Sequence, residues 1–274
     1  YHELDGMFLK LDILGHDDPL ILKKMYELTG VDYAKITPDD DKVMSLFSDT
    51  AALGISPEDI GGVSVGTLGI SEFGNSCAVK MLEMLRPSAF SQLVKIDGLL
   101  HGTDVWEGNA KELIESGTAG LDECIGTRDD VMQYLLEHDF DRDAAFRIME
   151  AVRKGHGLSI VWTSAMEERN IPDWYIKSCN KIGYLFPRAH AVSYTYMAWL
   201  TAWYKLYYPE EFYKVYFEVK GKACGEKKDI SDAGLVEERI REYEKKEGLS
   251  ATERNSLAVL YVAREMHARR RCLL

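Results

Sequence analysis

Amphipathic segments that each end in glycine, proline or a polar turn follow one another along most of this 274-residue chain. In the first, Asp18 and Pro19 predict the helix cap and the first helical residue, and Gly30 predicts the end. The apolar side chains between them recur at helical spacing, at Leu22, Met25 and Leu28. Because each segment has one apolar face, the segments must pack on one another. The sequence therefore predicts a mainly α fold, a multi-helical domain.

Further helices are predicted from the same signals. One begins with Thr37 as its cap and Pro38 in its first turn. The others cover residues 78–86, 89–99, 109–117, 129–138, 141–155, 172–182 and 189–217. A charged linker follows near Lys220, and then two more helices, the second opened by a capping box from Ser250 to Glu253. Residues 54–76 are rich in Gly and Ser and predict a structured loop.

Residues 7–14, MFLKLDIL, are the exception and predict a β-strand. Side chains alternate along a strand, so Lys10 and Asp12 share one face and lie about 7 Å apart. They form either a satisfied ion pair or half of a site. A lone strand cannot satisfy its own backbone groups, so we expect its sheet to lie outside this sequence.

The charge, the cysteines and the lengths of the apolar runs disfavour several classes of protein. A net charge of −12 argues against wrapping nucleic acid over the whole surface, so any such contact must be local. The five cysteines are scattered and odd in number, which favours reduced packing residues over disulfides or a zinc site. No apolar run is long enough to cross a bilayer, and the first residues show no signal pattern. We expect a cytosolic protein, or a piece cut from one, with no membrane partner.

Asp12 is the first candidate for chemistry. A carboxylate at a strand end beside Lys10 suits one ligand of a metal-assisted phosphoryl-transfer site, with the lysine on a phosphate. The alternative is a half-exposed ion pair, which is the commoner reason for such a pattern. A metal clamp also needs a second carboxylate, and the nearby Asp17 and Asp18 are explained by the start of the following helix.

Basic side chains at predicted helix ends are the second group of candidates. Arg128 begins a helix among acidic neighbours, and Arg153 and Lys154 fall in the last turn of another. Surface pairing and the helix dipole account for such residues without a ligand. Arg188 and His190 follow Pro187 in a first turn, beside exposed N–H groups that can bind an anion. Together with Asp12, these residues suit a helical domain that grips a nucleoside triphosphate against a metal site on a neighbouring sheet.

Longer strings in the sequence resemble a known family. They are FLKLDILGHDDP, GTLGISEFG, GLLHGTDVWEGNAKELI, ECIGTRDDVM, IMEAVRKGHGL, IPDWYIKSCNKIGYLFPRAHAVSY and YYPEEFYKVYF. In this order they resemble the bacterial replicative DNA polymerase III alpha subunit of the PolC type. The resemblance covers about residues 5–220 and continues more loosely to about residue 268.

This resemblance implies a division of the chain. Residues 1–17 would be the last strand of the catalytic palm, residues 18–220 the fingers domain, and residues 221–274 a linker and following helices, truncated. Asp12 matches the third carboxylate of the family's two-metal site, and Lys10 matches a basic residue near the triphosphate. The cations Arg128, Arg153, Lys154, Arg188 and His190 fall in fingers motifs near the nucleotide.

The sequence also departs from the family pattern. The paired palm aspartates, the exonuclease, the PHP domain, the oligonucleotide-binding domain and the clamp-binding motif are not in it. Ser71 stands where the family leads us to expect Pro, and the stretch 221–232 differs from the usual acidic one. Residues 270–274 do not follow the family, and the basic run ARRRCLL suggests a chain cut within an element.

The resemblance implies template-directed addition of deoxynucleotides to a primer 3′ end, with two Mg²⁺ ions on the attacking and leaving oxygens. The implied partners are primer–template DNA, the incoming dNTP, and a sliding clamp and replisome proteins contacted through regions outside this sequence. We expect the isolated chain to be inactive, because one carboxylate cannot hold two metals. Two alternatives stay open: a helical metal phosphohydrolase using Asp12, His16, Asp17 and Asp18, and a helical nucleic-acid-binding module, which the charge disfavours.

Overall fold

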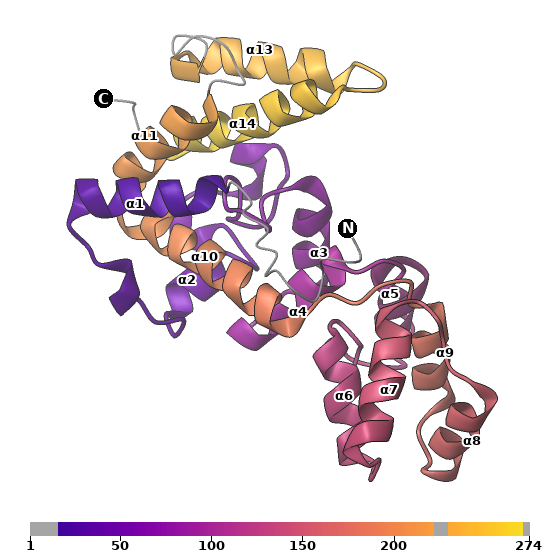
Figure 1. Cartoon of the computed structure of the whole chain (residues 1–274). Coiled ribbons are helices and arrows are strands. Elements are labelled where there is room, and N and C mark those ends of the chain that lie inside the picture. The colour runs from indigo at the N-terminus through magenta and orange to yellow at the C-terminus, as the bar shows by residue number, and fades with distance from the viewer. Residues whose placement is uncertain (1–15, 222–229, 271–274) are drawn as a thin grey trace, which may run out of the picture.

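The computed structural model describes residues 16–221 and 230–270, and over these residues the fold is mainly α (Figure 1). Extended pairing in the described part is confined to two isolated bridges, Thr103 with Tyr184 and Thr127 with Phe186. The strand predicted over residues 7–14, with Lys10 and Asp12, lies outside the described residues. The prediction of a multi-helical fold is confirmed.

Helices of three to twenty residues make up the described chain. In order they are α1 (Asp17–Thr29), η1 (Tyr33–Lys35), α2 (Asp41–Ser45), η2 (Ala51–Leu53), η3 (Pro57–Ile60), α3 (Ser76–Leu85), α4 (Phe90–His101), η4 (Trp106–Ala110), α5 (Lys111–Glu115), α6 (Arg128–Glu137), α7 (Arg142–Arg153), α8 (Ile160–Glu168), α9 (Asp173–Lys181), α10 (Arg188–Tyr207), α11 (Pro209–Lys220), α13 (Ala233–Glu244) and α14 (Ala251–Ala268).

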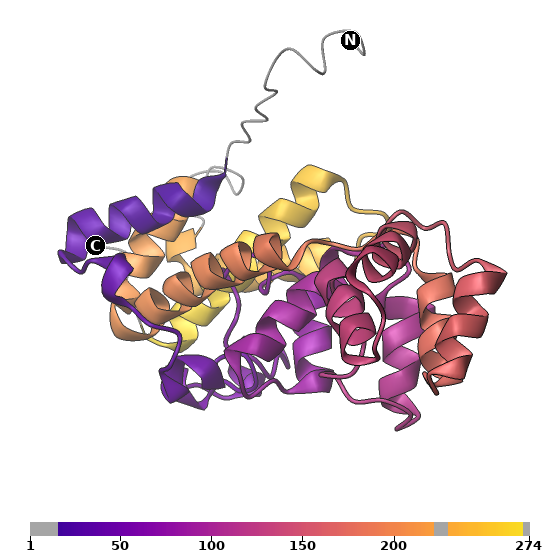
Figure 2. The same ribbon diagram turned by 60° about the horizontal axis from the view of Figure 1, so that its bottom comes forward.

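The longest helix, α10, organises the arrangement. It packs against α1, α2, α4 and α11, while α14 packs on its partner α13, on α11 and on η3. Figure 1 shows α13 and α14 at one end of the molecule and α6 to α9 at the other, with α10 between them. Figure 2 shows α1 lying along the same side as α11 and α10. The first turn of α10 therefore faces the α6 to α9 group, and its last turn faces α14.

Aromatic side chains explain why α10 is buried in spite of its polar atoms. Trp199 stacks on Phe47 at 6.2 Å between ring centroids, inside the core. Its indole N–H donates to the carbonyl of Thr37, and the Tyr196 and Tyr204 hydroxyls donate to the carbonyls of Ile36 and Val31. Each ring buries an apolar body while its polar tip fixes the loop between α1 and α2.

A buried ion pair joins the last turn of α10 to α14. Lys205 Nζ lies 2.8 Å from a carboxylate oxygen of Glu265, and both side chains are fully buried. The same ammonium donates to the carbonyls of Gly66 (2.8 Å) and Leu68 (2.5 Å), so all three of its protons are used. The Tyr213 hydroxyl donates to Glu265 Oε1 at 2.6 Å. Burial lowers the pKa of Lys205, and the Glu265 carboxylate opposes that shift.

Several local predictions are confirmed and three are wrong. The single helix predicted over residues 189–217 is divided at Tyr208 into α10 and α11, because Pro209 begins a new helix. Gly30 ends α1 in the left-handed region, at φ 69°. Asp18 does not cap α1, because His16 holds the cap position and the buried Asp18 side chain contacts His16 and Ser71 instead. The helix predicted from Thr37 starts later, because Asp40 accepts from the first N–H groups of α2.

Helix α8 was not among the predicted segments. Its first residues Ile160 and Val161 are exposed, and only Met166 is buried. Its sequence therefore has no regular apolar stripe to indicate a helix. At the other end of the chain, the Ser250 to Glu253 capping box is present at the start of α14. None of the described helices is both long and apolar enough to cross a membrane.

We predict that Lys205→Met lowers the free energy of unfolding by about 3–5 kcal/mol, because it leaves the Glu265 carboxylate buried without its cation. Adding Glu265→Gln removes the stranded charge and keeps an acceptor for Tyr213, so the double variant should recover much of the loss. Urea unfolding measures both. Lys214→Met, on the exposed face of α11, is the control. Equal stability of Lys205→Met and the control would contradict the prediction.

We also predict that Cys124 and Cys179 resist alkylation in the folded protein, whereas Cys77 reacts. Cys77 is exposed, and the other two thiols are buried. Burial raises the pKa of Cys124 to about 11 and that of Cys179 to about 12, so neither forms the reactive thiolate at neutral pH. Peptide mapping after brief treatment with iodoacetamide, with and without urea, measures this. Rapid labelling of Cys179 without urea would contradict the packing of α9.

Candidate functional site

An extended segment, residues 183–187, connects α9 to α10 and contacts the ends of three other helices. Thr103, just after α4, donates its N–H to the Tyr184 carbonyl at 3.0 Å. The N–H of Leu185 donates to the carbonyl of Arg153 at 3.2 Å, at the end of α7. The N–H of Arg128 donates to the Phe186 carbonyl at 3.1 Å, at the start of α6. This segment, here called the junction segment, therefore gathers helix ends that are far apart in sequence.

Asp130 holds the junction together. One oxygen of its carboxylate accepts from the N–H groups of Gly126 (2.9 Å) and Thr127 (2.8 Å) and lies 2.9 Å from Lys95 Nζ on α4. The other oxygen pairs with the guanidinium of Arg188 at the start of α10. One side chain of α6 thereby fixes α4 and α10.

The environment of Asp130 keeps it ionised. Burial alone raises the pKa of this carboxyl, but the ammonium of Lys95 and the hydrogen bonds from Gly126 and Thr127 outweigh burial and lower the pKa below its ordinary value. Nearby, α4 passes so close to residue 126 that a Cβ on Gly98 would lie 2.6 Å from the Gly126 carbonyl oxygen. The charge of Asp130 and the missing side chain of Gly98 together permit this close packing.

The predicted cationic side chains differ in how closely acidic side chains hold them. Arg153 donates two hydrogen bonds to Glu150, at 2.7 and 2.9 Å, and Lys154 lies 3.3 Å from the same carboxylate. The bonds from Arg153 lower the pKa of Glu150 to about 2. Arg128 is 39% exposed and has only a long, 4.0 Å approach to Asp129.

The N-terminus of α10 is less open than its sequence predicts. The N–H of Arg188 donates to Asp129 Oδ2 at 2.8 Å, so a carboxylate of the chain already occupies part of the expected anion site. His190 is exposed, and its ring meets the Phe186 ring edge-on at 5.8 Å. Among the described residues, the candidates beside the junction segment with the weakest acidic contacts are therefore Arg128 and His190.

Aromatic rings extend from the junction segment toward α1. The imidazole of His101 stacks on Phe186 at 4.8 Å between centroids. Tyr194 of α10 stacks on the other two rings, 6.4 Å from His101 and 6.3 Å from Phe186, and lies 5.6 Å from His16. These rings connect the start of α1 with the start of α10.

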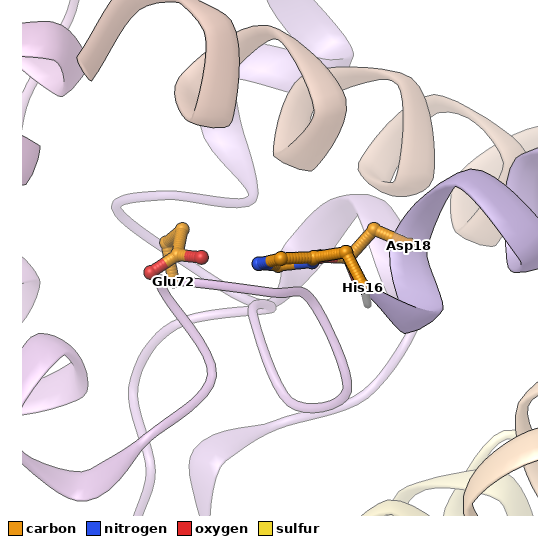
Figure 3. Close-up of side chains that lie close together, drawn as sticks. All are labelled: His16, Asp18 and Glu72. Carbon is orange, nitrogen blue, oxygen red and sulfur yellow. The ribbon is translucent and has the colours of Figure 1, made fainter. Parts of the chain in front are cut away.

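Acidic and histidine side chains surround these rings and form a cluster of His16, Asp18, Glu72, Asp97 and His101, here called the acid–histidine cluster. Figure 3 shows His16 and Asp18 at the start of α1, with the imidazole directed toward Glu72. On the other side of Glu72, its carboxylate lies 3.3 Å from His101 Nε2. The nearby carboxylates of Asp97 and Glu72 raise the pKa of His101 to about 10.

A cavity of about 720 Å³ lies between α4, α6, α9 and the first turns of α10, and Arg188 is one of the residues that line it. Its walls include the rings of Phe90, Tyr134 and Trp174, and Lys95 and Asp130 line it as well. The volume and the mixture of aromatic and charged walls are typical of ligand sites.

The structure thus brings Arg128, Arg153, Lys154, Arg188 and His190 to one junction, although their roles there stay predictions. Lys10 and Asp12 lie outside the described residues. Sequence reasoning missed four residues that support the junction, which are Glu72, Lys95, Asp97 and Asp130. Glu72 and Lys95 meet His101 and Asp130 only through packing, whereas the i,i+4 spacing of Asp97 and His101 and the capping box of Thr127 and Asp130 are local signals.

Comparison with known proteins identifies the family. Residues 18–168 match the model of the bacterial DNA polymerase III alpha subunit finger domain. The chain belongs to this family. The finger-domain match runs from the second residue of α1 to the end of α8, and it includes Asp130 and every member of the acid–histidine cluster except His16.

The chain is also similar to whole polymerases. It is 48% identical over 271 residues to the DNA polymerase III PolC-type of Caldanaerobacter subterraneus, and 45% identical to those of Clostridium perfringens and Listeria monocytogenes. Each comparison covers 98% of this chain and 19% of the relative. The chain thus spans about a fifth of the length of the relatives that it matches.

We predict that Asp130→Asn lowers the free energy of unfolding of the finger domain by about 2–3 kcal/mol, because the buried amide loses its ion pairs with Lys95 and Arg188. Thermal unfolding by circular dichroism measures the loss. Glu167→Gln, an isosteric change at an exposed position of α8, is the matched control. An unchanged melting temperature for Asp130→Asn would show that Asp130 does not hold the junction.

Proposed function

We propose that this chain is the fingers part of a replicative DNA polymerase that adds deoxynucleotides to a primer 3′ end under the direction of a template. The observation that carries the proposal is the 45–48% identity, over nearly the whole chain, to proteins named DNA polymerase III PolC-type. In the proposed enzyme the chain acts within a longer polypeptide, because a fingers domain positions substrate for chemistry on a neighbouring palm.

The junction provides the proposed nucleotide contacts. Arg128 has only a long approach to Asp129, and His190 is exposed beside the junction segment, while Arg153, Lys154 and Arg188 are held nearby by acidic partners. A triphosphate is a strong acceptor for guanidinium and imidazolium groups, so these side chains suit contact with its oxygens. The pairing with Asp130 and Glu150 limits their motion, which lowers the entropy lost on binding.

The metal chemistry is proposed for the palm. Asp12 would supply one carboxylate to a divalent metal site, with Mg²⁺ as the ion, and Lys10 would lie near the phosphates. Both residues lie outside the described part of the chain. We propose primer–template DNA and dNTP as partners, a sliding clamp and replisome proteins for the longer polypeptide, and the cytoplasm as its location.

The alternative of a phosphohydrolase has less support. It requires His16, Asp17 and Asp18 to act on one metal with Asp12. In the structure, Asp18 pairs with His16 Nδ1 at 2.7 Å, whereas Asp17 pairs with Lys220 of α11 at 2.6 Å. Neighbouring carboxylates of α1 therefore have separate partners and do not converge.

We predict that the purified 274-residue chain extends no primer in the presence of Mg²⁺ and dNTPs, because the expected palm carboxylates are not in it. A chimera in which this chain replaces the matching segment of the Caldanaerobacter relative should restore metal-dependent primer extension. Extension by the isolated chain would contradict the fragment interpretation. A well-folded chimera without activity would contradict the proposed function.

In the same chimera, we predict that Arg128→Ala raises the KM for dNTP about tenfold, which corresponds to about 1.4 kcal/mol, because a contact with the triphosphate is lost. Arg142→Ala is the matched control, since Arg142 is also the first residue of a helix and is exposed. Steady-state kinetics with varied dNTP measure both. Equal KM values for the two variants would exclude Arg128 from the nucleotide site.

A further inference from the structure

The cavity of about 720 Å³ between α4, α6, α9 and the start of α10 has walls that contacts between these helices hold in place. Tyr134 of α6 stacks on Tyr175 of α9, with 3.9 Å between the ring centroids. Lys95 of α4 lies 2.9 Å from the Asp130 carboxylate of α6, which also pairs with Arg188 of α10. The four helices are thus joined around the cavity, and ligand sites in proteins are usually formed in advance in this way.

Two rings of the lining have a face that no other described ring covers. Phe90, the first residue of α4, meets one described ring, that of Trp199, at 5.9 Å and an angle of 83°. Trp174, in the first turn of α9, meets one described ring, that of Tyr175, at 5.5 Å and 69°. One such near-perpendicular contact occupies at most one face of a ring. Both side chains are only partly buried, so a flat aromatic ligand in the cavity can contact them.

Carboxylates dominate the charged part of the lining. The basic side chains there, Lys95 and Arg188, both contact Asp130. The three other carboxylates of the lining accept hydrogen bonds from neutral donors, and none of them forms an ion pair within the described residues. They are Asp122, with the amide of Gln92 at 3.0 Å, Glu123, with the N–H of Gly120 at 2.7 Å, and Glu137, with the amide of Gln133 at 2.9 Å. The lining is therefore net negative.

This charge decides which ligands suit the cavity. The phosphates of a nucleotide would be repelled by Asp122, Glu123 and Glu137, so the cavity is unsuited to the triphosphate proposed for the junction. A positively charged ring system is attracted by the same carboxylates. It is also attracted by the faces of aromatic rings, most strongly by that of a tryptophan.

We propose that this cavity binds one free small molecule of the planar aromatic cation class. Trp174 and Phe90 contact its rings, and Glu123 and Glu137 attract its positive charge. Small-molecule sites have volumes of about 300–1,000 Å³, so the cavity is large enough for several fused rings. The site is separate from the polymerase function proposed above, and its test uses neither nucleotide nor DNA, so each proposal can fail without the other.

Titration of the 274-residue chain with proflavine, a cation of three fused rings, tests the proposal at neutral pH. We expect one equivalent of dye to bind and to quench tryptophan fluorescence. Acridine, which has the same ring system without the charge, should bind at least about fivefold more weakly. Glu137→Gln keeps an acceptor for Gln133 and should weaken proflavine binding about threefold, with no effect on acridine. Trp174→Leu should weaken the binding of both dyes at least about tenfold.

Matched controls separate the cavity from general attraction of a cation to an acidic chain. Trp162→Leu changes a partly buried tryptophan of α8 and Glu167→Gln an exposed carboxylate of the same helix, and neither residue lines the cavity. Both variants should bind proflavine as the unaltered chain does.

Three results would overturn the proposal. The first is the absence of proflavine binding up to about 1 mM dye. The second is equal affinity for proflavine and acridine. The third is binding that Glu137→Gln weakens no more than Glu167→Gln does. Glu137→Gln alters an exposed side chain, so it tests the site even if Trp174→Leu does not fold, which its melting temperature will show.

Discussion

The buried contact between Lys205 and Glu265 is the interaction on which the rest of this arrangement depends. It fixes the last turn of α10 to α14 and to the carbonyls of Gly66 and Leu68. An ion pair without water is favourable only when every remaining polar atom has a partner, and here the tyrosine hydroxyl of α11 completes the shell of Glu265. Because α10 is one continuous helix of 20 residues, fixing its last turn also sets the position of its first.

The first turn of α10 carries two of the predicted nucleotide contacts, Arg188 and His190, and acidic side chains hold Arg188 and the two cations at the end of α7. Asp130 pairs with Arg188, and Glu150 pairs with both Arg153 and Lys154. In a chain of net charge −12, such pairing keeps cations in fixed positions instead of spread over a basic surface. A bound anion must compete with these carboxylates, so the arrangement favours a ligand of high local charge over weak association with any polyanion.

The acid–histidine cluster occupies the opposite side of the same junction. The ring of His101 contacts Phe186 on one face while its edge meets Glu72 and Asp97, so the cluster and the junction segment share a residue. The ring of His101 thus packs directly on Phe186, two residues before Arg188. Together with Tyr194, which contacts both His16 and His101, it connects the start of α1 with the start of α10.

The sequence by itself determined the helical class, most helix positions and the end of α1, because apolar spacing, Gly30 and the Ser250 capping box are local signals. Its resemblance to a polymerase family agrees with the finger-domain match over residues 18–168. The sequence could not place α8, whose apolar residues are largely exposed. It also misplaced the start of α1, where His16 holds the cap position without a side-chain cap bond, and the start of α2, which Asp40 caps. Tertiary structure alone decided that Asp130 joins α4, α6 and α10, and that Glu72 meets two histidines from distant helices. Local patterns encode which residues are helical, whereas contacts between residues far apart in sequence depend on how the helices pack.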